Sequence, residues 1–339
     1  MHGIKRKNFT QELIKQKKLK DQAKIKYYRE LNNQLLIAYK TNHKYDLESF
    51  KLTSIILDLN PELNVAWNFR RKIILNYFLQ NTDSNVAFDW NQELNFTMLQ
   101  LKRYPKVYWI WNHRTWCLRY VNDIQMWQNE LHLVDKMLAV DARNFHGWTY
   151  RRYVVSQLKK NEPSNSDLLN ETEFDYTTVK INKDISNFSA WHQRASLFPG
   201  KLSQLQGYSA KLELIKNEIS YLTNAIFTDA EDQSVWIYLK WFITDATIVG
   251  ILQTGEGGDG YLNVLKQFED SIQIINNDEI EFSGKDNNWC LKILIVIQTI
   301  FFDKLQVEKG GRTDDRRIML EKLVEVDPLR KNRYLYLLK

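Results

Sequence analysis

The sequence predicts an all-α fold, a solenoid of stacked antiparallel helical hairpins. The 339 residues include only 12 Gly and 5 Pro, too few for the frequent tight turns of a β fold. A tryptophan-centred motif recurs five times at intervals typical of helical repeats. Within each copy, apolar residues follow one another by three or four positions, which is the spacing of one helix face.

Residues 1–45 are predicted to form a basic arm and a lead helix. Ten Lys and Arg residues lie among residues 1–29, against Glu12 and Asp21, so this arm carries a charge of +8 and the rest of the chain carries −2, which together give the net charge of +6. A basic arm on a near-neutral body favours nucleic-acid binding less than a basic groove does, so we expect no nucleic-acid partner.

Composition also places the chain outside membranes and secretory pathways. No apolar stretch follows the basic N-terminus as it would in a secretory signal, and the most apolar run, residues 289–302, is too short to cross a bilayer. Two cysteines fit a reducing compartment. We therefore expect a cytoplasmic protein that is not an integral membrane protein.

Residues 46–339 are predicted to form the repeat domain. Its five motif tryptophans are separated by 44, 37, 43 and 45 residues: Trp67, Trp111, Trp148, Trp191 and Trp236. Apolar residues lie seventeen and ten positions before each tryptophan and predict the first helix of each hairpin. In four repeats a glutamate lies eighteen positions before the tryptophan, where we expect the positive end of that helix: Glu93, Glu130, Glu173 and Glu218.

The second helix of each hairpin carries the tryptophan. An Asn or Asp lies seven positions before it in four repeats and is predicted to start this helix: Asn60, Asp141, Asp184 and Asp229. Arginines follow three positions after four of the tryptophans and are expected to pair with acids or stack on rings of a neighbouring hairpin: Arg70, Arg114, Arg151 and Arg194. The tryptophans themselves and Cys117 are expected in the core.

The array has interruptions and an expected end. Residues 161–171 and 255–260 are predicted to be loops between repeats. Degenerate copies near Trp289 and Tyr334 are predicted to close the array at the C-terminus.

The Trp-x-x-Arg motif, with Asn/Asp and Pro/Ala six or seven positions ahead, resembles the protein prenyltransferase α-subunit repeat over roughly residues 48–339. The segments KIKYYRELNNQ, NPELNVAWNFRR and EVDPLRKNRYLYLL resemble the Rab geranylgeranyltransferase (type II) group of that family. The chain has no leucine-rich spacing like that of the larger animal members, so it resembles the compact fungal form.

This resemblance implies a right-handed superhelical crescent that wraps around a β subunit in an obligate heterodimer. The β subunit would hold the catalytic zinc and the isoprenoid pocket, so this chain would be inactive alone. The implied reaction moves a geranylgeranyl group from geranylgeranyl diphosphate to C-terminal cysteines of Rab GTPases presented by an escort protein. Two alternatives stay open: the α subunit shared by farnesyltransferase and the type I enzyme, and a non-enzymatic helical-repeat scaffold of the RNA-processing type.

The resemblance also assigns three candidate catalytic residues. Lys106 and Tyr108 precede Trp111, and His146 precedes Trp148, in columns where the family carries Lys, Tyr and His facing the isoprenoid diphosphate. Such donors stabilise the charge that grows on a departing diphosphate. Phe145 stands where the farnesyl enzyme has Tyr, so a hydroxyl contact is absent there. No His/Cys/Asp cluster has ligand spacing, so we expect no metal site in this chain and zinc on the partner.

Overall fold

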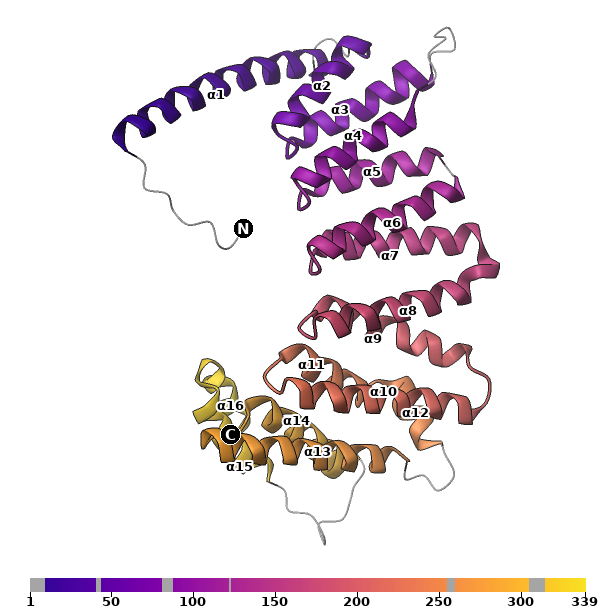
Figure 1. The fold of residues 1–339 in the computed structure, drawn as a ribbon, viewed down its shortest axis with the longest axis vertical. Helices are drawn as coiled ribbons and strands as arrows, with labels where there is room; N and C mark the ends of the chain where they lie inside the picture. Colours follow the sequence, from indigo (N-terminus) through magenta and orange to yellow (C-terminus); the bar gives the residue numbers. More distant parts are fainter. Residues whose placement is uncertain (1–9, 41–43, 81–87, 122, 255–259, 305–314) are drawn as a thin grey trace. The chain divides into compact units, whose positions relative to one another are not determined.

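The computed structural model describes residues 10–40, 44–80, 88–121, 123–254, 260–304 and 315–339 (Figure 1). Every regular element among these residues is helical, as predicted. The elements of the N-terminal half are α1 Gln11–Lys40, α2 Leu47–Leu59, α3 Asn64–Ile73 with a π-helical extension Ile74–Leu79, α4 Trp90–Arg103, α5 Tyr108–Val121, α6 Ile124–Val140 and α7 Phe145–Asn161.

The C-terminal half continues the same pattern with shorter helices near its end. Its α-helices are α8 Ser166–Lys183, α9 Phe188–Gln204, α10 Tyr208–Thr228, α11 Gln233–Phe242, α12 Ala246–Gln253, α13 Gly260–Ser283, α14 Asn288–Thr299, α15 Arg316–Val326 and α16 Lys331–Leu337. Short 3₁₀ turns cover Pro163–Asn165 and Pro328–Arg330, and a π-helical segment, Ile300–Lys304, extends α14.

The chain forms two compact units, Met1–Met137 with Asn144–Val154, and Leu138–Arg143 with Val155–Lys339. In the first unit, α2 packs against α3, α4 against α5, and α3 against α5. In the second, α8 packs against α9, α10 against α11, and α9 against α11. Within each unit, helices therefore pair as hairpins and neighbouring hairpins contact one another through their second helices.

The turns between paired helices correct one prediction. The Asn or Asp seven positions before the tryptophan ends the first helix rather than starting the second: Asn60 closes α2, Asp184 closes α8 and Asp229 closes α10. Each side chain accepts a hydrogen bond from the N–H two residues on, at 3.1 to 3.2 Å. This Asx turn lets the chain reverse before the second helix begins four residues later.

The motif tryptophans lie in the core, as predicted. Trp67 and Trp236 are fully buried, and the other three are at most 5% exposed. A buried indole N–H needs an acceptor. Four of these tryptophans donate to the backbone carbonyl six residues earlier, at 2.8 to 3.0 Å: Trp67, Trp111, Trp191 and Trp236. The tryptophan thus holds the hairpin turn closed as well as filling the core.

Buried ion pairs connect consecutive hairpins. In three cases the guanidinium of one hairpin binds both carboxylate oxygens of a glutamate in the next, at 2.5 to 2.7 Å, and both partners are at most 5% exposed: Arg70–Glu93, Arg114–Glu130 and Arg194–Glu218. The prediction that the arginines pair with acids of a neighbouring hairpin is confirmed here. The dipole explanation for the glutamates is wrong for Glu130, Glu173 and Glu218, which lie in the interiors of α6, α8 and α10 rather than in their first turns.

The same arginines also bind their own hairpin. The remaining guanidinium nitrogen donates to a threonine on the first helix, at 2.8 to 3.2 Å: Arg70 to Thr53, Arg114 to Thr97 and Arg194 to Thr177. In the third repeat this position holds Val134, and Arg151 instead binds the adjacent Asp135. The fifth repeat has Leu239 in the arginine column and Leu222 in the threonine column, so both polar groups are lost together.

Residues 161–171 are helical rather than a loop, which corrects a second prediction. Asn161 ends α7, a 3₁₀ turn covers Pro163–Asn165, and α8 begins at Ser166. Pro163 fits the first position of that turn, where its missing N–H costs nothing. Of the second predicted loop, residues 255–259 lie outside the described residues, as do residues 1–9 of the basic arm.

The C-terminal hairpins carry a modified form of the motif. The Tyr334 hydroxyl donates to Asp327, seven residues earlier, at 2.6 Å, and Tyr334 is only 4% exposed. Lys292 on α14 pairs with the same carboxylate at 2.7 Å. Trp289 is only partly buried, whereas its neighbours Cys290 and Leu291 lie in the core.

Among the described residues, no single helix combines the length and apolarity needed to cross a bilayer. Helices α11 and α12 meet those criteria only when taken together, and they are bent by 52°. The buried residues of α11 include Trp236 and Leu239 of the repeat core.

We predict that removing one buried guanidinium strongly destabilises the fold. Arg114→Leu leaves Glu130 charged and buried without its partner, which should lower the free energy of unfolding by about 3–5 kcal/mol. Urea unfolding followed by tryptophan fluorescence measures the change. Arg103→Leu is the matched control, because Arg103 pairs with Asp58 at the surface, with both side chains more than half exposed. That change should cost less than about 1 kcal/mol, and equal losses in both variants would contradict the prediction.

Candidate functional site

The structure gathers the three candidate residues at one end of two hairpins in the first unit. Lys106 lies in the turn between α4 and α5, and Tyr108 is the first residue of α5. His146 is the second residue of α7. The closed turns bring the starts of these two second helices together, because successive hairpins repeat the same geometry.

Contacts among these side chains are direct. The Tyr108 and His146 rings meet edge to face, with centroids 4.2 Å apart and planes at 90°. His146 also forms a hydrogen bond with the backbone of Lys106. The Phe145 ring lies 5.5 Å from the His146 ring, also nearly perpendicular. Tyr108, His146 and the Lys106 backbone therefore form one cluster, with Phe145 at its edge.

The imidazole of His146 favours its neutral form. Partial burial lowers its pKa, the hydrogen bond to the Lys106 backbone raises it, and the nearby Lys106 charge lowers it again, with a net decrease. A neutral imidazole has one N–H to donate. The Lys106 side chain and the Tyr108 hydroxyl can therefore donate hydrogen bonds to an anion, whereas the single N–H of neutral His146 is already used in its bond to the Lys106 backbone.

The cluster is exposed rather than enclosed. Lys106 is exposed, Tyr108 retains 57% of its accessible surface and Phe145 retains 63%. An anion bound here would remain in water, where a single ammonium contributes little. The cluster is chemically suited to a diphosphate but needs another surface to exclude solvent.

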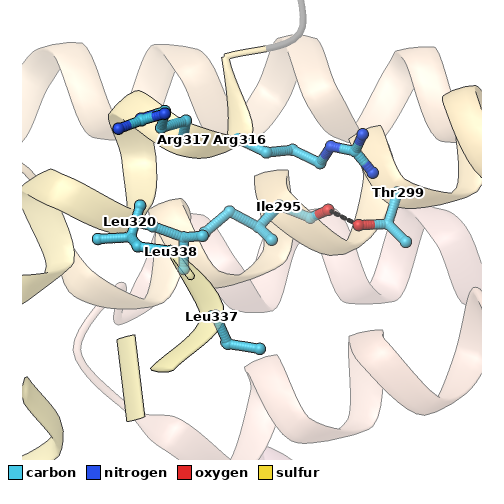
Figure 2. Close-up of a pocket in the computed structure, with 7 residues that line it drawn as sticks. All are labelled: Ile295, Thr299, Arg316, Arg317, Leu320, Leu337 and Leu338. Carbon is cyan, nitrogen blue, oxygen red and sulfur yellow. Dashed lines mark hydrogen bonds between the residues drawn. The ribbon is translucent and has the colours of Figure 1, made fainter. Parts of the chain in front are cut away.

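Three cavities of about 370, 420 and 490 Å³ lie elsewhere on the chain. Figure 2 shows the 420 Å³ cavity at the C-terminal end, with Arg316 and Arg317 on its rim and leucines from α15 and α16 beside them. The two guanidinium groups point in opposite directions, so they do not converge on one anion. The Thr299 hydroxyl already donates to the Ile295 carbonyl at 2.7 Å. This cavity therefore lacks the converging donors of a diphosphate site.

A second cluster, Glu93 with His113 and Cys117, was not expected from the sequence. Its potential metal-ligand atoms lie within 4.8 Å of one another, and all three residues are buried. Glu93 already binds Arg70 through both oxygens and accepts a 2.6 Å hydrogen bond from His113. The Arg70 guanidinium compensates the charge of the Glu93 carboxylate, so no metal ion is needed to account for the burial of this group.

The pKa values in this cluster follow from burial and pairing. Burial raises the pKa of Glu93, but the Arg70 charge and the His113 hydrogen bond outweigh it and lower the pKa to about 2. Burial lowers the pKa of His113 and raises that of the Cys117 thiol well above its usual range. Cys117 is thus an inert core thiol, as predicted from its place in the apolar column.

The residue two positions after the tryptophan has a structural role that the sequence did not predict. His113, Tyr150 and Tyr238 occupy it in three repeats, and each bonds to the glutamate of its own hairpin at 2.6 to 2.8 Å. Each of these glutamates is the one that binds the arginine of the preceding hairpin. The residue type in this column varies from repeat to repeat and includes Phe69 in the first, so the sequence shows no common pattern there.

Comparisons with known proteins agree with this architecture. Residues 90–121, 127–158, 170–199 and 215–246 match the family model described as the protein prenyltransferase alpha subunit repeat. A geranylgeranyl transferase type-2 subunit alpha of Saccharomyces cerevisiae is 47% identical over 341 residues, which cover 100% of this chain and 99% of the yeast protein. The Candida albicans protein of the same name is 36% identical, with 98% and 96% of the two chains covered.

More distant relatives match in part or in fold. The human protein of that name is 32% identical over 72% of this chain, which corresponds to 42% of the human protein. A solved structure of Candida albicans protein geranylgeranyltransferase-I complexed with GGPP has a TM-score of 0.63, with 19% identity and coverage of 92% of this chain and 90% of that one. At that identity the likeness concerns the fold alone.

We predict that the Glu93 pair makes the fold acid-sensitive in a defined range. Because the pKa of Glu93 falls from 4.5 to about 2 on folding, the carboxylate stabilises the fold above about pH 4.5. That contribution, about 3 kcal/mol, should disappear progressively as the pH falls towards 2. Glu93→Gln should therefore be much less stable than wild type at pH 6, with the difference shrinking on acidification.

Unfolding free energies measured by urea titration between pH 2.5 and 6 test this expectation. Glu48→Gln is the control, because the Glu48 side chain is 83% exposed and should leave the pH dependence unchanged. A difference between wild type and Glu93→Gln that is constant with pH would show that the loss is not electrostatic.

Proposed function

Because the chain belongs to the geranylgeranyl transferase type-2 alpha-subunit family, within the protein prenyltransferase alpha subunits, we propose that it is one half of a heterodimeric cytoplasmic enzyme. This enzyme transfers the geranylgeranyl group of geranylgeranyl diphosphate to C-terminal cysteines of Rab GTPases that an escort protein presents. The observation that carries the proposal is the meeting of Lys106, Tyr108 and His146 on an exposed edge of the first unit.

The relatives favour this group over its nearest rival. Full-length relatives carry the type-2 name, whereas the solved type I structure shares only the fold. A helical-repeat scaffold for RNA would need basic residues along the array, but the repeat arginines at the hairpin junctions are buried in ion pairs. The scaffold alternative does not explain the exposed Lys–Tyr–His cluster, whereas the shared α subunit would use it in the same way.

The reaction needs groups of the kind that this cluster supplies. The cysteine sulfur attacks C1 of the isoprenoid, the C1–O bond breaks, and its electron pair leaves on the diphosphate. Negative charge therefore grows on the diphosphate oxygens in the transition state. Donors already aimed at those oxygens stabilise the transition state more than the ground state.

Each residue of the cluster has a distinct part in this step. Lys106 supplies a full positive charge towards the leaving diphosphate. Tyr108 donates a hydrogen bond to its oxygens, and its edge-to-face contact with His146 orients both rings. His146 would donate to the diphosphate only through its second ring nitrogen, when that nitrogen is protonated. Phe145 beside them offers only an apolar face.

The exposure of the cluster supports the proposal that a second subunit is required. Solvent around Lys106 weakens its attraction for the diphosphate, and a covering surface would strengthen it. We propose that the β subunit supplies this cover, the isoprenoid pocket and the zinc ion. Zinc bound there would lower the pKa of the substrate cysteine so that it attacks as a thiolate.

We predict that Lys106→Ala slows prenyl transfer without disturbing assembly. The side chain is exposed, so its removal costs little packing, whereas loss of one preorganised charge typically costs about 2–4 kcal/mol, or roughly 10²–10³ in rate. Lys106→Arg should restore only part of the rate, because a planar guanidinium places its charge differently. His146→Ala should show a smaller loss, since the neutral imidazole contributes mainly through its contacts with Tyr108 and the Lys106 backbone.

Single-turnover rates on preassembled heterodimer measure the chemical step without interference from product release. Lys136→Ala is the control for loss of a surface lysine, since Lys136 lies within α6, outside the cluster. Wild-type rates in both Lys106→Ala and His146→Ala would refute the assignment of the site.

We predict one zinc ion per heterodimer and none on this chain alone. Metal analysis after dialysis of the purified heterodimer and of the isolated chain tests this distribution. A Glu93→Gln variant of the chain removes one potential ligand from the buried Glu93–His113–Cys117 cluster and so tests whether zinc binds there. Stoichiometric zinc on the isolated wild-type chain that disappears in this variant would place a metal in this subunit and contradict the proposal.

A further inference from the structure

Three buried asparagines connect consecutive turns along the array. Asn144, Asn187 and Asn287 are at most 3% exposed. Each accepts a hydrogen bond from the N–H three residues on and so caps its own helix, at 3.1 to 3.2 Å. Each also donates its side-chain amide to a carbonyl in an earlier turn, at 3.3 to 3.4 Å: Asn144 to Pro105, Asn187 to Ala142 and Asn287 to Ala230.

Asn144 differs from the other two asparagines because its hydrogen bonds hold backbone segments next to candidate catalytic residues. Its amide bonds to the carbonyl of Pro105, the residue immediately before Lys106. Its own position is immediately before Phe145 and His146, and its cap fixes the first turn of α7. A single buried side chain therefore joins the backbone that carries Lys106 to the backbone that carries His146.

The Pro105 carbonyl is fixed from both hairpins. Trp111 of its own hairpin donates an indole N–H to it at 3.0 Å, and Asn144 of the next hairpin donates an amide N–H at 3.4 Å. The side chains of Lys106 and Tyr108 are exposed and receive little support from packing. Their distance from His146 therefore depends on how firmly the two turns are joined.

We propose that Asn144 is a positioning residue for the prenyl-transfer reaction, an inference that rests on the function proposed above. It touches no substrate. It holds the Lys106 turn against the start of α7, so that the ammonium and the imidazole reach the same diphosphate together. A displacement of about 1 Å between reacting or stabilising groups can cost up to about 10²-fold in rate, so a link between two hairpins is sufficient to matter.

Asn144→Ser tests the proposal with a matched control. Serine still caps α7, but its short side chain does not reach the Pro105 carbonyl. Asn287→Ser removes the equivalent link to Ala230 in the second unit, together with a bond to Glu231, away from Lys106 and His146. Both changes should lower the melting temperature of the heterodimer by similar amounts. Only Asn144→Ser should slow single-turnover transfer, by about tenfold or more, while Asn287→Ser stays within about twofold of wild type.

A double-mutant cycle separates positioning from general damage. In a Lys106→Ala background the charge to be positioned is already gone, so adding Asn144→Ser should cost only about twofold in rate. The same loss in both backgrounds, or equal losses for Asn144→Ser and Asn287→Ser, would overturn the inference. If serine impairs assembly, Asn144→Asp keeps the shape and the cap but turns an oxygen towards Pro105, and the same cycle applies.

The outcomes also distinguish this inference from the proposed function. A slow Lys106→Ala variant with a normal Asn144→Ser variant removes the positioning role alone. A wild-type rate for Lys106→Ala removes the assigned site, and the inference about Asn144 with it.

Discussion

The buried bond between an arginine of one hairpin and a glutamate of the next is the constraint on which the repeat depends. A guanidinium and a carboxylate are costly to bury, and each is tolerated only with its hydrogen-bonding capacity used. Arg114 shows how completely this is achieved: two nitrogens bind Glu130, and the third binds Thr97 and the Leu94 carbonyl. Tyr150 then uses a remaining lone pair of the glutamate. The spacing of helices, and hence the period of the sequence, follows from this geometry.

The repeat period could be predicted from the sequence because residues of the same type recur at the same positions of the repeat. Trp67 and Arg70 recur in the same columns, since a large ring with one donor and a forked cation have no close substitutes. The roles of the glutamates and threonines were misjudged or missed, because their partners lie in another helix and spacing alone does not show which helix. His113 and Tyr150 escaped detection for a related reason: donors of different shape serve the same acceptor.

The residues of the candidate site were predicted from the sequence, but their contacts with one another were not. Lys106, Tyr108 and His146 were assigned by family resemblance, and their association across two hairpins came only from the structure. Asn144 gave no signal in the sequence, because an asparagine before a helix reads as an ordinary cap. Its second bond, to Pro105, spans 39 residues and appears only when the turns are stacked. What the sequence lacks is mainly information about which turn lies beside which.

The two partners of each inter-hairpin bond are also synthesised in a fixed order. In each pair the arginine is synthesised first, and its glutamate follows 23, 16 or 24 residues later. At about 5–20 residues per second, a ribosome delivers the acid within roughly five seconds. Meanwhile Arg70, Arg114 and Arg194 can already bond to the threonine on the helix made just before them. Each new hairpin thus emerges with one internal bond made and a guanidinium ready for the next, which suits growth from the N-terminus by successive addition.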